Sequence, residues 1–211
     1  MKIITHRGLW TEVSQQNTLA AFKLSQQENW GIETDLRSFQ GKLFLSHDPL
    51  KSSTHAPSLE DLLNLWADTP ELPIFMNIKE DGLLPLLRPF KTSIHSLNII
   101  FFDMSIPQLI QYAKEFPRSM LATRYSEHER HPAALELCQW LWVDGFEVDP
   151  APEDLSSFVK VKKMSIAVVS PELHSRQPQR AWNKFLAASW IPQGDLAICT
   201  DWPQKLKREI R

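Results

Sequence analysis

Short apolar runs rich in β-branched and aromatic residues recur along the whole chain, and most intervals between them have the periodicity of helices. Nine runs are predicted strands: Lys2–Thr5, Gly31–Leu36, Leu43–His47, Ile74–Ile78, Asn98–Phe102, Met120–Thr123, Leu141–Val143, Ile166–Val169 and Leu196–Thr200. Alternation of strand and helix is typical of a parallel sheet covered by helices. The pattern therefore predicts an α/β fold.

Nine strands are one more than a simple eightfold repeat contains. The short polar link at residues 38–42 carries Gly41 and can turn Gly31–Leu36 into an antiparallel hairpin with Leu43–His47. The other eight strands then fit a compact (β/α)8 TIM barrel, a fold whose lower size limit of ~200 residues the chain just exceeds. An open doubly wound sheet is the alternative. Because no Pro/Gly-rich linker interrupts the 211 residues, they are predicted to form a single domain.

Capping residues and apolar spacing predict where the helices begin. Asn17 and Thr18 can cap a helix that carries Leu19, Phe22 and Leu24, and Ser58 precedes an apolar run with acidic residues in its first turn. Five further helical segments are expected at Gly82–Phe90, Ile106–Phe116, Pro132–Gln139, Glu153–Lys162 and Pro178–Ala188.

The charge balance excludes some classes of partner. A net charge of −2 without a basic block argues against nucleic acid binding. No apolar run approaches the ~18 residues of a membrane span. At the amino terminus, the apolar run is too short for the apolar region of a secretory signal. We therefore expect a cytoplasmic protein without stable membrane insertion. Cys138 and Cys199 have no metal-ligand spacing and are predicted to be buried apolar residues, and the sequence leaves the oligomeric state open.

Polar side chains stand where the early strands should end, and in parallel α/β folds this edge carries the chemistry. His6 and Arg7 end the first strand, and His47 ends the hairpin strand. Histidines with an ordinary pKa near ~6.5 are suited to acid and base catalysis at neutral pH.

Two further pairs have the spacing of residues on one strand face. Glu33 and Asp35 are two residues apart, as are Asn77 and Lys79. Two carboxylates on one face repel each other unless a cation lies between them, and Mg²⁺ and Ca²⁺ prefer such oxygen ligands. Together with the cations Arg7 and Lys79, this set is suited to a phosphodiester.

In this order the motifs resemble the glycerophosphodiester phosphodiesterase family, among the barrel phosphodiesterases related to phosphatidylinositol-specific phospholipase C. The resemblance rests on His6-Arg7-Gly8, Asn17-Thr18-Leu19-Ala20-Ala21-Phe22, Glu33-Thr34-Asp35, His47-Asp48, Asn77-Ile78-Lys79 and Thr200-Asp201-Trp202-Pro203. The matching residues are densest in the first 80 positions.

The resemblance implies a (β/α)8 barrel that splits a glycerophosphodiester, or a similar small phosphodiester, with the help of a divalent cation, Mg²⁺ or Ca²⁺. By position it implies that His6 is the general base and His47 the general acid. Arg7 and Lys79 would bind the phosphate. Glu33, Asp35 and Asn77 would be metal ligands, with Asn77 in the place where the family usually has a glutamate.

The departures leave alternatives open. Asn77 carries one formal charge fewer than a glutamate, so weaker metal binding is expected, and Glu80, Asp81 or Glu127 are candidates to compensate. Gln16 also replaces a glutamate usual in the family. The alternatives are a lyase that ends at a cyclic phosphate and an anion-binding barrel with weakened catalysis. Further candidate ligand contacts are Trp10, Arg124 and Asp144, whereas His174 is interpreted as a surface residue.

Overall fold

The computed structural model describes residues 1–52, 55–192 and 194–210. The strands are β1 (Lys2–His6), β2 (Gly31–Phe39), β3 (Lys42–Leu45), β4 (Ile74–Ile78), β5 (Ile99–Phe102), β6 (Ala122–Tyr125), β7 (Trp140–Val143), β8 (Ser165–Val169) and β9 (Leu196–Thr200). The α-helices are α1 (Leu19–Gln27), α2 (Leu59–Trp66), α3 (Leu84–Leu87), α4 (Lys91–His95), α5 (Ile106–Tyr112), α6 (Ser156–Lys160), α7 (Gln179–Ala187) and α8 (Pro203–Glu209). Short 3₁₀ helices lie at Val13–Gln15, Arg88–Phe90, Arg118–Met120, Leu135–Leu137, Pro152–Leu155 and Pro171–His174.

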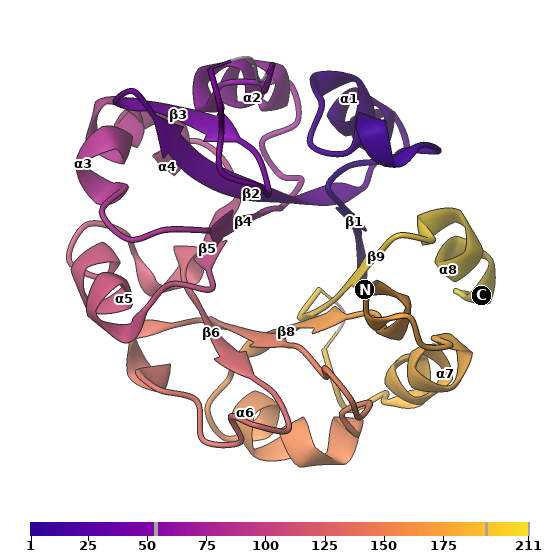
Figure 1. The fold of residues 1–211 in the computed structure, drawn as a ribbon. Helices are drawn as coiled ribbons and strands as arrows, with labels where there is room; N and C mark the ends of the chain where they lie inside the picture. The colour runs from indigo at the N-terminus through magenta and orange to yellow at the C-terminus, as the bar shows by residue number, and fades with distance from the viewer. Residues whose placement is uncertain (53–54, 193, 211) are drawn as a thin grey trace.

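Eight parallel strands curve into a nearly closed barrel with the helices outside it (Figure 1). Their order is β5-β4-β2-β1-β9-β8-β7-β6, and β3 pairs antiparallel with β2 at the side of this path. Between β5 and β6, a single parallel bridge joins Phe101 to Leu121. The predicted TIM barrel and its extra hairpin strand are therefore confirmed.

Some predicted elements differ from the structure in extent. Met120 belongs to a 3₁₀ helix and not to β6, and His47 lies beyond the end of β3. The α-helix predicted at Pro132–Gln139 is absent, and three residues of 3₁₀ helix stand there instead. The backbone of Ala134 is left-handed (φ 53°), which interrupts a right-handed helix at this point. Leu24 is exposed on α1 and does not join Phe22 in the core.

The apolar residues form two layers on opposite sides of the strands. The outer layer lies between strands and helices and includes Ile32, Trp66 and Trp182. The inner layer fills the barrel axis, where Phe75 packs edge-on against Trp140 with ring centroids 5.2 Å apart. Successive side chains of a strand point to opposite faces, so each strand contributes to both layers.

The same alternation places the polar residues. Inward-facing apolar residues are followed two positions later by polar ones at the carboxyl ends of four strands: Ile4 by His6, Phe75 by Asn77, Trp142 by Asp144 and Cys199 by Asp201. These side chains therefore lie above the apolar layer at the mouth of the barrel, which is the usual catalytic face of this fold.

Trp66 gives a direct test of the outer layer. It is fully buried, and its Nε1 donates a hydrogen bond to the carbonyl oxygen of Leu72 at 2.9 Å. We expect Trp66→Ala to lower the free energy of unfolding by about 3–5 kcal/mol, because it leaves a cavity and an unpaired carbonyl. Urea titration followed by circular dichroism measures this loss, and Leu24→Ala on the exposed face of α1 is the control. A loss below about 1 kcal/mol for Trp66→Ala would contradict the described packing.

Candidate active site

His6 forms a hydrogen-bonded pair with Asp201. β1 and β9 are neighbours in the barrel, so the residue after β9 stands beside the end of β1. Nδ1 of His6 lies 2.7 Å from Oδ1 of Asp201, and its Nε2 lies 3.9 Å from Oε2 of Glu33. Burial by itself lowers the pKa of His6, but the hydrogen bond with Asp201 and the negative charge of Glu33 raise it above its ordinary value. The ring is thus oriented and prepared to hold a proton.

Glu172 fixes the carboxylate partner of His6. Its side chain accepts hydrogen bonds from the backbone N–H of Asp201 (3.1 Å) and from the hydroxyl group of Thr200. It also bonds the hydroxyl group of Ser170, which accepts a hydrogen bond from the buried indole of Trp182. A chain of hydrogen bonds therefore runs from the outer core to the histidine.

A tight turn directs Arg7 into the same site. Arg7 is left-handed (φ 57°), and its N–H donates to the carbonyl oxygen of Glu33 at 2.9 Å. Gly8 follows with φ +90°, and a Cβ on it would lie 2.7 Å from the Cβ of Ala21. Only glycine is suited to this close approach to α1. Gln16 accepts a hydrogen bond from Nη1 of Arg7 (3.2 Å), so the amide that departs from the family pattern still orients the guanidinium group.

The two carboxylates of β2 have different surroundings. Asp35 lies 3.1 Å from Nε of Arg7 and 3.7 Å from Nζ of Lys79, and its Oδ2 accepts a hydrogen bond from Asn17. Glu33 is 3% exposed and its Oε2 has no hydrogen-bond partner. Burial, followed by the charge of Asp35, raises the pKa of Glu33. Asp35 is thus neutralised by side chains, whereas Glu33 is a buried carboxylate in need of a positive charge.

The surroundings of Glu33 fit a hard divalent cation. Asn77 is paired in register with Asp35 on the neighbouring strand, and its Oδ1 is also buried without a hydrogen-bond partner. Carboxylate and amide oxygens are ligands that Mg²⁺ and Ca²⁺ prefer, with water or substrate oxygens completing the shell. Within residues 1–52, 55–192 and 194–210, no group of three or more His, Cys, Asp and Glu side chains is arranged to hold a metal ion. The site therefore offers few side-chain oxygens as metal ligands.

His47 is the most exposed member of the predicted set. It lies in the loop after β3, its side chain is 46% exposed, and its Nδ1 is 2.9 Å from Oδ1 of Asp48. The loop is held near the barrel because Arg37 donates from Nε to the carbonyl oxygen of His47 at 2.8 Å.

One pocket of about 330 Å³ brings all the predicted site residues together. Its lining includes His6, Arg7, Glu33, Asp35, His47, Asn77 and Lys79. The opposite side of the pocket is lined by residues in or just after the carboxyl ends of β5, β7 and β8, among them Phe102, Asp103, Trp142, Asp144, Phe146 and His174.

Several other sequence-based interpretations need correction. Trp10 does not line this pocket, since its indole donates to the carbonyl oxygen of His6 (2.9 Å) from the side. Arg124 is paired with Asp103 and Glu129 and also lies outside the lining. His174, interpreted as a surface residue, lines the pocket and bonds Asp144.

The proposed compensating carboxylates are engaged elsewhere. Glu80 bonds Ser38 and Arg37, and Asp81 accepts from Ser105. Glu127 binds the backbone of the loop after β7. None of the three lines the pocket.

The sequence predicted Asn17 only as a capping residue of α1, where Thr18 is the cap, and assigned neither Asn17 nor Asp201 a role in the site, although both lie in the quoted motifs. Asn17 is buried and left-handed (φ 55°), accepts from Thr34 and donates to Asp35. The sequence signal for this position of Asn17 was its residue type, because asparagine tolerates a left-handed backbone, together with its place directly before a helix cap.

Glu127 tests how the far side of the pocket is held. Burial by itself would raise the pKa of Glu127, but hydrogen bonds from the backbone N–H groups of Glu147, Phe146 and Val148 lower it to about 2. The lowered pKa of Glu127 contributes stability that is fully present above its ordinary pKa of 4.5 and is lost progressively as the pH falls from 4.5 through about 2. We expect amide exchange at 146–148 to be at least about tenfold faster at pH 4 in Glu127→Ala than in the wild type, by NMR. Glu153→Ala is the control, and equal exchange in Glu127→Ala and wild type would refute this role.

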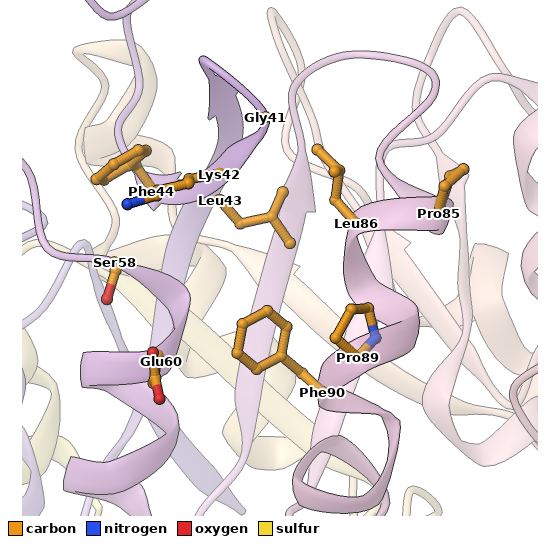
Figure 2. A pocket seen from close by; sticks show the side chains of 10 residues that line it. All are labelled: Gly41, Lys42, Leu43, Phe44, Ser58, Glu60, Pro85, Leu86, Pro89 and Phe90. Carbon is orange, nitrogen blue, oxygen red and sulfur yellow. The ribbon is translucent and has the colours of Figure 1, made fainter.

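A second pocket lies away from the chemistry. It occupies about 450 Å³ on the outside of the barrel, between the β2–β3 hairpin, α2 and α3. Figure 2 shows Leu43, Leu86 and Phe90 converging there with Ser58 and Glu60 on the opposite wall. Its lining is mainly apolar and contains none of the predicted site residues.

Comparisons with known proteins establish the fold. Neither the protein-family models nor the curated proteins provide a match. Among solved structures, a glycerophosphodiester phosphodiesterase from Parabacteroides distasonis is similar over 99% of this chain and 96% of its own, with 15% identity and a TM-score of 0.71. One from Thermotoga maritima is similar over 99% and 97%, with 20% identity and a TM-score of 0.63. This chain shares their barrel fold.

The similarity in fold also extends to a different kind of enzyme. A mutant tryptophan synthase α-subunit from Pyrococcus furiosus matches over 99% of this chain and 91% of its own, with 14% identity and a TM-score of 0.50. Because barrels with different chemistries share this architecture, the function has to be argued from the pocket.

In the described part of the chain, the helices are too short or too polar to cross a membrane.

Proposed function

We propose that this protein is a metal-dependent phosphodiesterase that hydrolyses glycerophosphodiesters or a similar small phosphodiester. One observation carries the proposal. Seven residues from four segments of the chain, which were predicted as a phosphodiester site, line one pocket at the carboxyl ends of the strands. The glycerophosphodiester phosphodiesterases with the same barrel fold support the choice of substrate.

His6 is the proposed general base. It takes the proton from the neighbouring hydroxyl group of the substrate that attacks phosphorus, and Asp201 at 2.7 Å stabilises the positive ring that results. Departure of the alcohol leaves a cyclic phosphate, which water then opens to the phosphate monoester. Glu172 keeps Asp201 in place through its backbone N–H. His47 is the proposed general acid, which returns a proton to the oxygen of the departing alcohol.

Arg7 and Lys79 are the proposed phosphate ligands. Asp35 lies within 4 Å of both side chains and holds the two cations at one side of the pocket. Preorganised cations of this kind stabilise the charge that develops on the phosphate oxygens. Glu33, Asp35 and Asn77 would hold the divalent cation, which supplies Lewis-acid stabilisation when it is bound.

A second candidate is an anion-binding barrel without turnover. The sparse donor set favours it, because Asp35 is already paired with Arg7 and Lys79 and only Glu33 and Asn77 offer unpartnered oxygens. The anion-binding barrel is expected to bind a phosphodiester without forming a product from it.

Phosphorus NMR separates these candidates. The protein is incubated with glycerophosphoglycerol and Mg²⁺ or Ca²⁺, and the products are followed over time. The proposal predicts a glycerol phosphate monoester, whereas an accumulating cyclic phosphate indicates the lyase. An unchanged substrate spectrum with either metal, in a folded protein that binds the substrate, would support the anion-binding barrel and reject the phosphodiesterase.

A further inference from the structure

A second histidine–aspartate pair, formed by His174 and Asp144, lines the pocket that holds His6. Asp144 follows β7 and His174 ends the 3₁₀ helix after β8, so the two neighbouring strands bring them together. Oδ1 of Asp144 lies 2.6 Å from Nε2 of His174. The side chain of His174 is 25% exposed and that of its partner 16%, close to the values of 17% and 20% in the pair of His6. The pocket is thus lined by two histidines that are each oriented by a carboxylate.

The pairing leaves the second ring nitrogen of His174 available. Nδ1 has no hydrogen-bond partner among the residues that the structure describes. An ionised carboxylate only accepts hydrogen bonds, so Asp144 places the ring hydrogen on Nε2 and the lone pair on Nδ1. A neutral imidazole in this tautomer is a base with a fixed orientation.

The 3₁₀ helix Pro171–His174 is held on both sides. Glu172, in the same turn as His174, accepts a hydrogen bond from the backbone N–H of Asp201 at 3.1 Å. Arg176, two positions beyond the helix, donates to the carbonyl oxygen of Gly145 in the loop after β7. One short segment therefore positions His174 directly and braces the carboxylate partner of the other histidine.

The proposed reaction needs a second base. His6 takes a proton when the cyclic phosphate forms and has to return it when the ring opens, so it is the acid of the second step. Another group has to take a proton from the attacking water. His47 is one candidate, but its side chain is 46% exposed and that of its partner Asp48 is 88% exposed. His174 is the less exposed candidate and has the less exposed partner.

We propose that His174 is the base that activates water when the cyclic phosphate opens, and that Asp144 is its positioning residue. The inference rests on the proposed phosphodiesterase, which forms the cyclic phosphate. The oxygen of water bonds to phosphorus, and its proton moves to His174. The bond between phosphorus and the substrate's own oxygen breaks, and this oxygen takes the proton that His6 holds. The proton on His174 then passes to solvent, from which His47 regains the proton it gave to the alcohol.

Cyclic glycerol phosphate, supplied as the substrate, tests the second step by itself. Its opening by the whole protein with Mg²⁺ or Ca²⁺ is followed by phosphorus NMR, and a thermal unfolding curve checks each variant. We expect His174→Gln to lower kcat for opening by at least about 10²-fold. Asp144→Asn should lower kcat by at least about tenfold with little change in KM, and it carries the test if His174→Gln does not fold.

His128→Gln is the matched control. The rings of His128 and His174 both lie near that of Phe146, with centroids 6.2 Å and 5.3 Å from it, but His128 does not line the pocket. This variant should open the cyclic phosphate as fast as the wild type.

The diester separates this inference from the proposed function. With glycerophosphoglycerol, His174→Gln should still consume the substrate but accumulate the cyclic phosphate, whereas the wild type forms the monoester. Equal opening of the cyclic phosphate by His174→Gln and wild type would reject the role of His174 and keep the phosphodiesterase. Loss of opening in His47→Gln alone would assign the base to His47 and likewise overturn the inference.

Two results with the wild type complete the test. A wild type that opens no cyclic phosphate would overturn the inference, whether or not it consumes the diester. A wild type that opens the cyclic phosphate but leaves the diester intact would reject the proposed phosphodiesterase, and the comparison with His174→Gln would still decide the role of His174.

Discussion

His6→Gln lowers kcat for phosphodiester hydrolysis by about 10²–10⁴-fold with the fold retained, since general base catalysis contributes this much. The expectation follows from the position of His6, whose ring bonds Asp201 at 2.7 Å and lies beside Glu33 in the pocket. Glutamine keeps hydrogen-bonding capacity but cannot hold the proton. Steady-state kinetics with a glycerophosphodiester, beside a thermal unfolding curve, measures the effect.

Matched variants make this prediction specific. His131→Gln alters an exposed histidine outside the pocket and should leave kcat unchanged. Asp201→Asn should lower kcat less than His6→Gln does. It should also shift the acidic limb of the pH–rate profile, which reports deprotonation of His6, to lower pH, because the carboxylate raises the pKa of His6. If His6→Gln retains more than a tenth of the wild-type kcat, the proposed base is wrong.

Glu33→Gln abolishes metal-stimulated turnover, with an expected loss in kcat of at least about 10²-fold. The same substitution removes a destabilising buried charge from the metal-free protein. Burial raises the pKa of Glu33 in the folded state. A raised carboxyl pKa means that folded stability falls as the pH rises from about 4.5 through the folded pKa. An amide at this position carries no charge and escapes this loss, so metal-free Glu33→Gln should lose less stability between pH 5 and pH 8 than the wild type.

Scanning calorimetry at the two pH values measures this difference. His6 also has a raised pKa and stays in the variant, so some decline with pH should remain. Added Mg²⁺ should raise the Tm of the wild type at pH 8 and leave that of Glu33→Gln unchanged. Glu28→Gln, in an exposed ion pair with Lys207, is the control. If the stability of wild type and Glu33→Gln depends equally on pH, Glu33 is not the buried carboxylate whose raised pKa lowers stability at high pH.

The repeated order of short apolar strands and helical segments was sufficient to predict a parallel sheet covered by helices, and the motif resemblance favoured the barrel over an open doubly wound sheet. Spacing alone placed Glu33 and Asp35 on one strand face, and likewise Asn77 and Lys79. The position of Asn77 beside Asp35 depends on the register between β2 and β4. The helix at Pro132–Gln139 was predicted wrongly, because its apolar spacing gave no sign that Ala134 adopts a left-handed backbone.

The partners of the site residues depend on contacts between distant segments. His6 meets Asp201 only because β1 and β9 are neighbours in the closed barrel. Asp144 and His174 are 30 positions apart and meet across the ends of β7 and β8, so neither had a ligand spacing in the sequence. The pairing of Asp35 with both Arg7 and Lys79 likewise required three-dimensional distances.

Cleavage of a phosphodiester in this pocket is proposed to need a divalent cation. The most direct measurement is the hydrolysis of glycerophosphoglycerol by chelated protein, before and after Mg²⁺, Ca²⁺ or Mn²⁺ is restored, beside Glu33→Gln. We expect turnover that disappears on chelation, returns with metal and is lost in the variant. Turnover that persists in chelator, or no turnover with any metal in a folded protein, would contradict it.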